Sequence, residues 1–482
     1  MMSKQSAYIV IDVGTGNVRV AVVHPDGSVL SVAREDIQYS NDKAYPNALY
    51  FRPDVLWKQI VSLAKQALLE AQHVEIKALT ATSQREGIVV LDAKGQSLIG
   101  MPNIDHRGRE WEDNIGDKSH VYALTGRYPT SLFSALKLVG LRERRADIWK
   151  EYNSFLSISD WVEYKLSGVR KYEHSQASET LLYDVEKASW SETLCQYFDL
   201  DSSLLPPLVS SGTAIGGVLH HVARELLIST EAVVVAGGGD TQLAIKSTMP
   251  SVEDVVIVSG TTTPIVKLVD EYVLDEKERT WTSRDIEEGR FVFEANAGVT
   301  GLNYQRLKEI FYPNEGYDVI EKELAQNKNS FCLASLGSLV ADEERPLVKG
   351  GFIFPAPVTH ELSRSCFVWA TMLDIACSVA ENYKILCSIS PHQPDYIWAC
   401  GGGLQSLQLR QLIANLTGKK IMVREGFQQS SAVGGALLCN EALGLAVTVH
   451  HKTEQVYPEE QERFMGLYRE WKKARACFMQ AC

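Results

Sequence analysis

The chain has 482 residues, of which 45% are apolar and 22% charged, and its formal net charge is -12. This length predicts two or three domains, and the negative charge argues against nucleic acid as a partner because a phosphate backbone would be repelled. No apolar run reaches the roughly 20 residues of a membrane span, the nine cysteines form no C-x-x-C pair, and the first residues lack a signal-peptide profile. We therefore expect a cytoplasmic protein with buried thiols and no membrane contact.

An N-terminal hairpin with a polar tip is the first predicted feature. Residues 8–23 are rich in β-branched side chains and predict two strands. Around their turn the chain places Asp12, Gly14, Thr15, Gly16 and Arg19. An aspartate can hold a hydrated Mg²⁺, and the amides of a Gly/Thr turn can bind phosphate oxygens. A turn that merely needs flexible residues is the alternative, whereas a dinucleotide fingerprint is disfavoured because a strand follows where a helix should begin.

The following segments indicate α/β organisation. A helix over residues 55–72 and a buried strand over 76–83 predict a β-α-β unit with the first strand. Residues 121–208 predict mostly helices with short loops, and the charged segment 270–290 predicts an exposed connection. From about residue 453 we expect a polar, helical tail packed on the surface.

Three later glycine-rich segments repeat the strand-and-turn plan of the first hairpin. One strand ends in three glycines followed by Asp240, which is either a helix N-cap or a carboxylate that accepts a hydroxyl proton. Residues 253–269 predict two strands joined by the turn Gly260-Thr261-Thr262, and residues 394–418 predict a strand, three glycines and an amphipathic helix. The repeated plan predicts two related halves, residues 1–247 and 248–482, with a cleft between them.

Together these motifs resemble those of the FGGY carbohydrate kinases, members of the actin-like ATPase fold, over residues 8–445. In that family the first hairpin reads D-x-G-T-[TSG]-x-x-[RK], the base follows in G-G-x-D, the second hairpin carries G-[TS]-[TS], and the adenosine site carries G-G-G-x-x-S. The matching residues are Asp12, Gly14, Thr15, Gly16 and Arg19; Asp240; Gly260, Thr261 and Thr262; and Gly401, Gly402, Gly403 and Ser406. The resemblance implies an α/β protein with two actin-like (ribonuclease H-like) domains, mixed sheets flanked by helices and a cleft between the domains.

Some positions depart from the family pattern. Asn415 stands where an aspartate is usual after the adenosine motif, and Gly140 replaces the tryptophan of the K-x-x-W signature that begins at Lys137. The segment around Leu373 and Asp374 lacks the common arginine-alanine lead. These departures leave the fold assignment intact and affect only the subfamily.

The acceptor side is indicated by two further segments. Gln84-Arg85-Glu86 resembles the triplet that holds polyol hydroxyls in glycerol kinases, although a local surface ion pair of Arg85 and Glu86 is the alternative. The segment with Asn103, Asp105 and Arg107 looks more like the branch of autoinducer-2 kinases and xylulokinases. His106 and the pairs 220–221 and 450–451 show no metal-ligand spacing and are expected to be structural or exposed.

The resemblance implies ATP-dependent phosphorylation of a hydroxyl on a small sugar, polyol or related open-chain compound, either autoinducer-2-like or a pentulose. It implies ATP and Mg²⁺ as cofactors, Asp240 as base and Asp12 as a metal ligand through water. The phosphates and adenosine are assigned to Gly14, Thr15, Gly16, Arg19, Gly260, Thr261, Thr262, Gly402, Gly403 and Ser406, and the acceptor to Gln84, Arg85, Glu86, Asp105 and Asp240. A homodimer is the family-based expectation, and a catalytically weak or inactive sugar- and ATP-binding sensor is the alternative function.

Overall fold

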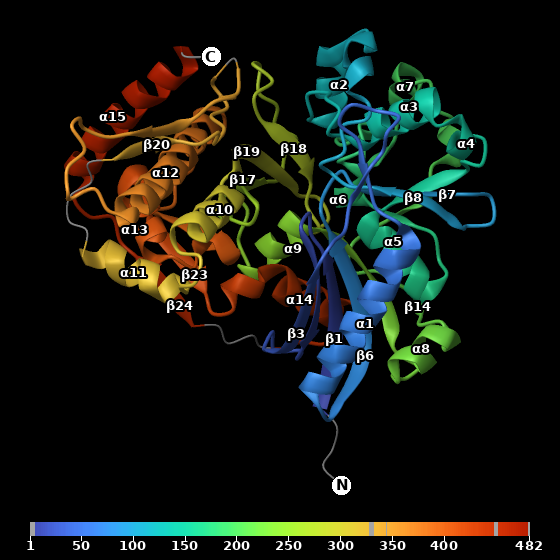
Figure 1. Cartoon of the computed structure of the whole chain (residues 1–482). Coiled ribbons are helices and arrows are strands. Elements are labelled where there is room, and N and C mark those ends of the chain that lie inside the picture. The colour runs from blue at the N-terminus through green and yellow to red at the C-terminus, as the bar shows by residue number, and fades with distance from the viewer. Residues whose placement is uncertain (1–4, 327–331, 344, 448–451, 481–482) are drawn as a thin grey trace. The chain divides into compact units, whose positions relative to one another are not determined.

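The computed structural model describes residues 5–326, 332–343, 345–447 and 452–480 and divides the chain into two compact units (Figure 1). The first unit comprises Met1–Ser247, Val269–Val292 and Gln429–His450, and the second comprises Thr248–Leu268, Phe293–Gln428 and His451–Cys482. Two late segments thus belong to the first unit, while the continuous domain ranges 1–247 and 248–482 remain a prediction. In the described residues no helix is long and apolar enough to cross a membrane.

A mixed sheet of six strands forms the centre of the first unit, with strand order β14-β15-β6-β1-β2-β3. Its strands are β1 (Gln5–Val13), β2 (Asn17–Val23), β3 (Val29–Asp36), β6 (Val74–Ser83), β14 (Ala214–Gly217) and β15 (Val233–Gly239). β1, β6 and β15 are parallel to one another, whereas β2, β3 and β14 pair antiparallel with their neighbours. The hairpin and the β-α-β unit expected from the sequence are both present.

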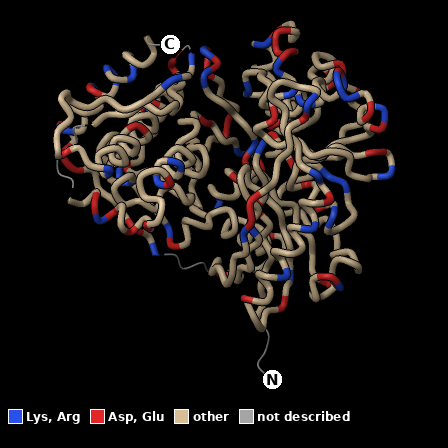
Figure 2. The backbone as a smooth tube through the Cα atoms, viewed as in Figure 1, with Lys and Arg blue, Asp and Glu red and all other residues tan. Residues whose placement is uncertain are grey.

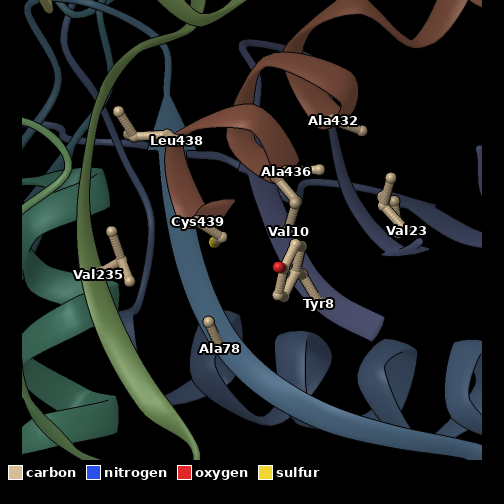
Figure 3. Close-up of a cluster of buried hydrophobic side chains, with 10 residues drawn as sticks. Tyr8, Val10, Val23, Ala78, Val235, Ala432, Ala436, Leu438 and Cys439 are labelled. Carbon is tan, nitrogen blue, oxygen red and sulfur yellow. The ribbon is translucent and has the colours of Figure 1, made fainter. Parts of the chain in front are cut away.

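Two helices show why this sheet forms a core. α1 (Pro53–Ala71) buries the predicted apolar stripe, although Leu68 at its edge remains half-buried. α14 (Ser430–Ala442) comes from the far end of the sequence, and its Ala432, Ala436 and Cys439 belong to one buried cluster with Tyr8 of β1 (Figure 3). Burying such apolar side chains contributes about 25 cal/mol per Å².

The region expected to be mostly helical, residues 121–208, also contains short strands. β9 (Ser154–Ser157) pairs antiparallel with β7 (Ile88–Leu91), because its short apolar run is fully buried when it joins a sheet. The other elements of the first unit are β4 (Ser40–Asn41), β5 (Leu49–Tyr50), β8 (Ser97–Met101), η1 (Arg109–Asn114), α2 (Lys118–Thr125), α3 (Ser134–Arg144), α4 (Ala146–Trp149), α5 (Ile158–Ser167), β10 (Tyr172–Glu173), α6 (His174–Ala177), β11 (Tyr183–Asp184), β12 (Ser189–Trp190), α7 (Glu192–Tyr197), η2 (Ser202–Leu204), β13 (Leu208–Val209), α8 (His220–Leu226), α9 (Asp240–Ser247) and β18 (Trp281–Arg284).

The charged segment 270–290 is not an exposed connection, which corrects the sequence-based expectation. Thr282 and Ser283 are 1% and 0% exposed, and the Thr282 amide donates to Gly126 O. The segment can be buried because its charges are neutralised locally, as in the ion pair of Arg290 with Asp285. In Figure 2 lysines and arginines are likewise interspersed with acidic residues along the chain.

The second unit contains another mixed sheet, in which β19-β17-β16-β22-β23-β24 lie in this order. Its elements are β16 (Val255–Val258), β17 (Thr262–Val269), β19 (Phe291–Val299), α10 (Gly301–Phe311), α11 (Tyr317–Gln326), β20 (Leu333–Ser335), β21 (Gly351–Ile353), α12 (Arg364–Ile389), β22 (Tyr396–Cys400), η3 (Gly402–Leu404), α13 (Leu407–Thr417), β23 (Lys420–Arg424), η4 (Phe427–Gln429), β24 (Thr453–Val456) and α15 (Gln461–Gln480). The tail was expected to be helical from about residue 453, and this is wrong at its start because β24 pairs with β23 there. The helix α15 follows, and its Trp471 is buried.

The strand that precedes Asp240 contains a β-bulge. Val235 pairs with Thr80 and Gly238 with Thr82, so two residues of β15, Ala236 and Gly237, face one residue of β6. The backbones approach so closely there that a Cβ on Gly237 would lie 1.8 Å from the carbonyl oxygen of Ala81. Gly237 is thus required by packing inside the protein.

We expect Gly237→Ala to lower the unfolding temperature by more than about 5 °C, because a backbone collision must be relieved by opening the bulge. Gly466→Ala is the matched control, since a Cβ on Gly466 in α15 meets no atom within 4 Å. There the exchange should be neutral or stabilising by up to about 1 kcal/mol. Thermal unfolding of both variants checks this, and equal unfolding temperatures would contradict the steric argument.

Candidate active site

Three parallel strands end in one row at the same edge of the first sheet. Val13 at the end of β1 lies beside Ser83 at the end of β6, and Ser83 lies beside Gly239 at the end of β15. The residues that leave the sheet at this edge are Gly14, Gln84 and Asp240. In open α/β sheets ligands bind outside the carboxyl ends of the strands. The register therefore brings together sequence motifs that are up to about 230 residues apart.

Asp12 is held through one carboxylate oxygen only. Its Oδ2 accepts a hydrogen bond from Ser431 Oγ at 2.6 Å and forms an ion pair with Arg19 Nη2, which lies 2.9 Å away. Its Oδ1 is buried and has no hydrogen-bond partner among the residues that the structure describes. A buried carboxylate oxygen without a partner is costly unless a ligand fills the position, so its chemistry fits a water molecule bound to Mg²⁺.

In the first turn, two of the three backbone amides expected to bind phosphate have no acceptor among the described residues. The Gly14 amide donates to Asn17 O at 3.0 Å, so it closes the turn and is not available to a phosphate. The amides of Thr15 and Gly16 have no acceptor among the described residues, and a Cβ on Gly16 would meet no atom within 4 Å. Packing inside the protein therefore does not explain Gly16, and the open space beside it fits a phosphate group.

Asp240 begins α9 and has one engaged oxygen. Its Oδ1 accepts from the Thr241 amide at 2.7 Å and from Thr241 Oγ1 at 3.3 Å. Burial raises the pKa of Asp240 to about 6, the cation of Arg85 opposes this rise, and the negative charge of Asp12 adds to it. A carboxylate that ionises close to neutral pH is suited to accept a proton from a hydroxyl group.

Arg85 and Glu86 form a buried pair of functional groups, which rules out the alternative of a surface ion pair. They are 7% and 5% exposed. Arg85 Nη1 lies 3.7 Å from Glu179 Oε1, and its guanidinium carbon lies 5.9 Å from the ring centre of Trp281. The guanidinium is thereby fixed between an acid and an aromatic face.

The carboxyl group of Glu86 accepts no hydrogen bond from the part of the chain that the structure describes. Its backbone has a φ of 62°, so it lies in a left-handed turn after β6. Burial raises the pKa of Glu86 to about 8, the Arg85 cation opposes this rise, and Glu179 adds to it. A buried acid without protein partners is a candidate ligand for substrate hydroxyls.

Gln84 and Asp105 have protein partners for the groups expected to bind substrate. Gln84 Oε1 accepts from the Asn103 amide at 2.9 Å, and Nε2 donates to Gly14 O at 3.1 Å. Asp105 is fully buried, and its two oxygens accept from the Leu49 amide and from Arg107 Nε. The structure thus shows protein contacts for both residues, and their direct contact with substrate stays a prediction.

Several residues at this site carried no local sequence signal. Ser431 and Trp281 come from segments read as part of the second half of the chain, and Glu179 pairs with the fully buried Arg127. In the sequence Lys137 is part of an incomplete K-x-x-W signature. In the structure burial lowers its pKa to about 8, and the negative charges of Asp105 and Glu86 oppose this decrease. Long-range packing, which no spacing rule encodes, brings these side chains to the site.

The expected phosphate turn of the second unit resembles the first. The Gly260 amide donates to Thr262 O at 2.9 Å, and a Cβ on Gly260 would meet no atom within 4 Å. β16 and β22 are parallel, with Val258 beside Cys400, so this turn and the adjacent glycines leave the second sheet at one edge. In both units, therefore, a hairpin turn and the glycines at the end of a parallel strand lie at the same edge of the sheet.

The three glycines after β22 have different roles. Gly401 has a φ of 98°, and a Cβ on it would lie 2.3 Å from Ser259 O; a Cβ on Gly403 would lie 2.3 Å from Ser259 Oγ. The nearest atom to a Cβ on Gly402 is 3.9 Å away, so the space beside this glycine is open. Ser406 caps α13 by accepting from the Leu409 amide at 3.2 Å.

Histidines form no cluster with acids or cysteines that could hold a metal, within the described residues. His106 lies 3.1 Å from Ser131 Oγ, and burial lowers its pKa to about 4. His220 and His221 begin α8, and the pair 450–451 lies outside the described residues.

Comparisons with known proteins decide the family. The model of the FGGY family of carbohydrate kinases, N-terminal domain, matches residues 7–246, and that of the C-terminal domain matches residues 321–443. The chain belongs to the FGGY family of carbohydrate kinases. It is 50% identical, over 99% of its length and 98% of the relative's, to YoaC of Bacillus subtilis (strain 168), a protein whose own assignment as a sugar kinase is provisional.

More distant relatives include the autoinducer-2 kinase of Salmonella typhimurium, 24% identical over 90% of this chain and 86% of that protein. Among solved structures, xylulose kinase from Lactobacillus acidophilus is 17% identical, with a TM-score of 0.84 over 98% of both chains. Plasmodium falciparum glycerol kinase with ADP is 18% identical, also with a TM-score of 0.84 over 98% of both chains. These matches confirm the predicted two-domain α/β fold, and family membership makes the protein an ATP-dependent carbohydrate kinase.

The raised pKa of Asp240 predicts the pH dependence of this FGGY kinase. The expected role of Asp240 as base requires its deprotonated form, so kcat/KM should be constant well above pH 6 and fall about tenfold per pH unit below it. Steady-state kinetics between pH 4.5 and pH 8, with unfolding monitored in parallel, measures this limb. An acid limb centred near pH 4, the ordinary range of a solvated aspartate, would contradict the environment described for Asp240.

Proposed function

We propose that this FGGY kinase phosphorylates a hydroxyl of a small open-chain substrate, either a pentulose or the autoinducer-2-like 4,5-dihydroxy-2,3-pentanedione. The shared edge of β1, β6 and β15 supports this proposal, because it places the turn after Asp12, the triplet with Glu86, and Asp240 next to one another. A phosphate site, an acceptor site and a base side by side are the parts that phosphoryl transfer needs.

In the proposed reaction Asp240 is the base. The acceptor hydroxyl oxygen attacks the γ-phosphorus of ATP, the bond to the ADP oxygen breaks, and the hydroxyl proton passes to the Asp240 carboxylate. The free Oδ2 is the atom suited to take the proton, because Oδ1 is already engaged by Thr241.

Charge on the transferring group is stabilised by donors of the first turn. The amides of Thr15 and Gly16 are free for this role, and Arg19 supplies a cation, while the amide of Gly14 only maintains the turn. By analogy with an oxyanion hole, each well-placed donor contributes about 3–4 kcal/mol in the transition state. In the second unit, Gly260, Thr261 and Thr262 are assigned to phosphate, and Gly402, Gly403 and Ser406 to adenosine.

Asp12 is assigned to Mg²⁺, held through a bound water by the unpartnered Oδ1. Bound Mg²⁺ would neutralise phosphate charge during transfer. The carboxylate of Asp12 is oriented by the contacts that Arg19 and Ser431 make with its Oδ2.

The acceptor is assigned to Arg85 and Glu86. A carboxyl group can hold two hydroxyls in either protonation state, and the fixed guanidinium of Arg85 donates to a further oxygen. Adjacent oxygens on an open chain suit this pair, and relatives named autoinducer-2 kinase and xylulose kinase act on compounds of this kind. Gln84 and Asp105 support the site from behind.

Glu86→Ala should raise the KM of the acceptor about 30-fold, because two hydrogen bonds of about 1 kcal/mol each are lost. The unfolding temperature should change little, since no protein partner is left unpaired within the described residues. Asp105→Asn is the contrasting variant. It removes the nearer of two ion partners of the fully buried Arg107, the other being Asp42, so it should lower the unfolding temperature and leave the acceptor KM near the wild-type value. The reverse pattern would contradict these assignments.

A coupled assay of ADP release tests the function itself, with xylulose, ribulose, glycerol and 4,5-dihydroxy-2,3-pentanedione as acceptors. We expect turnover with a pentulose or with the dione, and loss of that turnover by more than about 10⁴-fold in Asp240→Asn, which should keep nucleotide affinity and thermal stability. Release no faster than ATP hydrolysis in water with every acceptor would favour the inactive sensor. Near-normal turnover of Asp240→Asn would end the assignment of the base.

A further inference from the structure

The contact between Ser431 and Asp12 joins the two ends of the sequence, 419 residues apart. We propose that Ser431 is a positioning residue that orients the Asp12 carboxylate for the metal-bound water. This inference rests on the proposed assignment of Mg²⁺ to Asp12. Ser431 itself touches neither metal nor substrate in this proposal and acts through Asp12 alone.

The two oxygens of Asp12 are in different environments. Oδ2 accepts a hydrogen bond from Ser431 Oγ and forms an ion pair with Arg19 Nη2, whereas the buried Oδ1 has no hydrogen-bond partner among the described residues. A hydrogen bond and an ion pair on the same oxygen restrict the rotation of a carboxylate about its Cβ–Cγ bond, a torsion that otherwise spans a broad range of angles. The free oxygen therefore keeps one direction, as second-layer partners of metal ligands do elsewhere.

Ser431 suits this role better than Arg19 does. The Arg19 side chain is 33% exposed and is itself assigned to phosphate, so it can leave Asp12 when a nucleotide binds. Ser431 is only 8% exposed and lies in the first turn of α14, where its backbone is helical. Its hydroxyl is then the donor that stays on Oδ2 throughout the reaction.

The position of α14 is tightly determined by its neighbours. A Cβ on Gly434 would lie 1.9 Å from Leu243 O of α9, and a Cβ on Gly435 would lie 2.7 Å from Val10 Cγ1 of β1. At the far end of the helix, Asn440 accepts from Tyr8 OH and donates to Pro25 O, both at 2.7 Å. Figure 3 shows α14 lying against β1 and β6. Ser431 is thus held in a fixed place relative to Asp12.

The same helix has a natural control residue. Ser430 precedes Ser431, is 6% exposed, and makes no side-chain hydrogen bond to the residues that the structure describes. Removing the hydroxyl of Ser430 tests small changes in packing at the start of α14 without touching Asp12.

The test measures metal binding directly, by electron paramagnetic resonance of Mn²⁺ titrated into the full-length protein with ADP. Ser431→Ala should weaken Mn²⁺ binding about tenfold, the lower end of losses seen when such supporting partners of metal ligands are removed. Ser430→Ala should bind Mn²⁺ like the wild type, and Ser431→Thr, which keeps a hydroxyl, should recover most of the loss. Affinity for ADP without metal and the unfolding temperature should be unchanged in all three variants.

Two outcomes would overturn the proposal: wild-type Mn²⁺ affinity in Ser431→Ala, or an equal loss in Ser430→Ala, which would indicate general packing at the helix start. Asp12→Asn separates this failure from failure of the proposed metal site. If Asp12→Asn loses Mn²⁺ affinity while Ser431→Ala does not, only the role of Ser431 is wrong. If Asp12→Asn also binds Mn²⁺ normally, the assignment of the metal to Asp12 is wrong as well.

Discussion

The parallel alignment of β1, β6 and β15 is the constraint on which the site in the first unit depends. Because the three strands end in one row, the turn after Asp12, the triplet after Ser83 and Asp240, the proposed base, leave the sheet together. Antiparallel pairing of any one of them would send its motif to the opposite edge of the sheet. The helix α14 then completes this edge from the far end of the sequence, through Ser431.

The glycines around the candidate site fall into two physical classes. Gly237 and Gly401 are required because a side chain would collide with the backbone of Ala81 or Ser259. Gly16 and Gly260 face open space, and the protein alone gives no reason for them. The first class shapes the strand ends, and the second is what close approach of a phosphate would require. A glycine in these motifs can therefore reflect either close backbone packing or close approach of a phosphate.

Much of the fold could be predicted from local patterns, since the hairpin, the α/β alternation and the family motifs each depend on nearby residues. The predicted exposure of residues 270–290 was wrong because local ion pairs such as Arg290 with Asp285 allow a charged segment to be buried. The contact of Ser431 with Asp12 could not be predicted from the sequence, because it depends on how α14 packs against β1. The ion pair of Asp105 with Arg107 could not be predicted from the sequence, and the assignment of Asp105 to the acceptor stays a prediction.

A crystal structure of the full chain with Mg²⁺ and a non-hydrolysable ATP analogue is the most direct test of the account. In that crystal structure we expect a metal-bound water on Asp12 Oδ1 and terminal phosphate oxygens within hydrogen-bond distance of the Thr15 and Gly16 amides. The γ-phosphorus should also lie on the side of the sheet edge where Asp240 emerges. A nucleotide bound with its phosphates away from these amides, while Asp12 Oδ1 still has no partner, would contradict it.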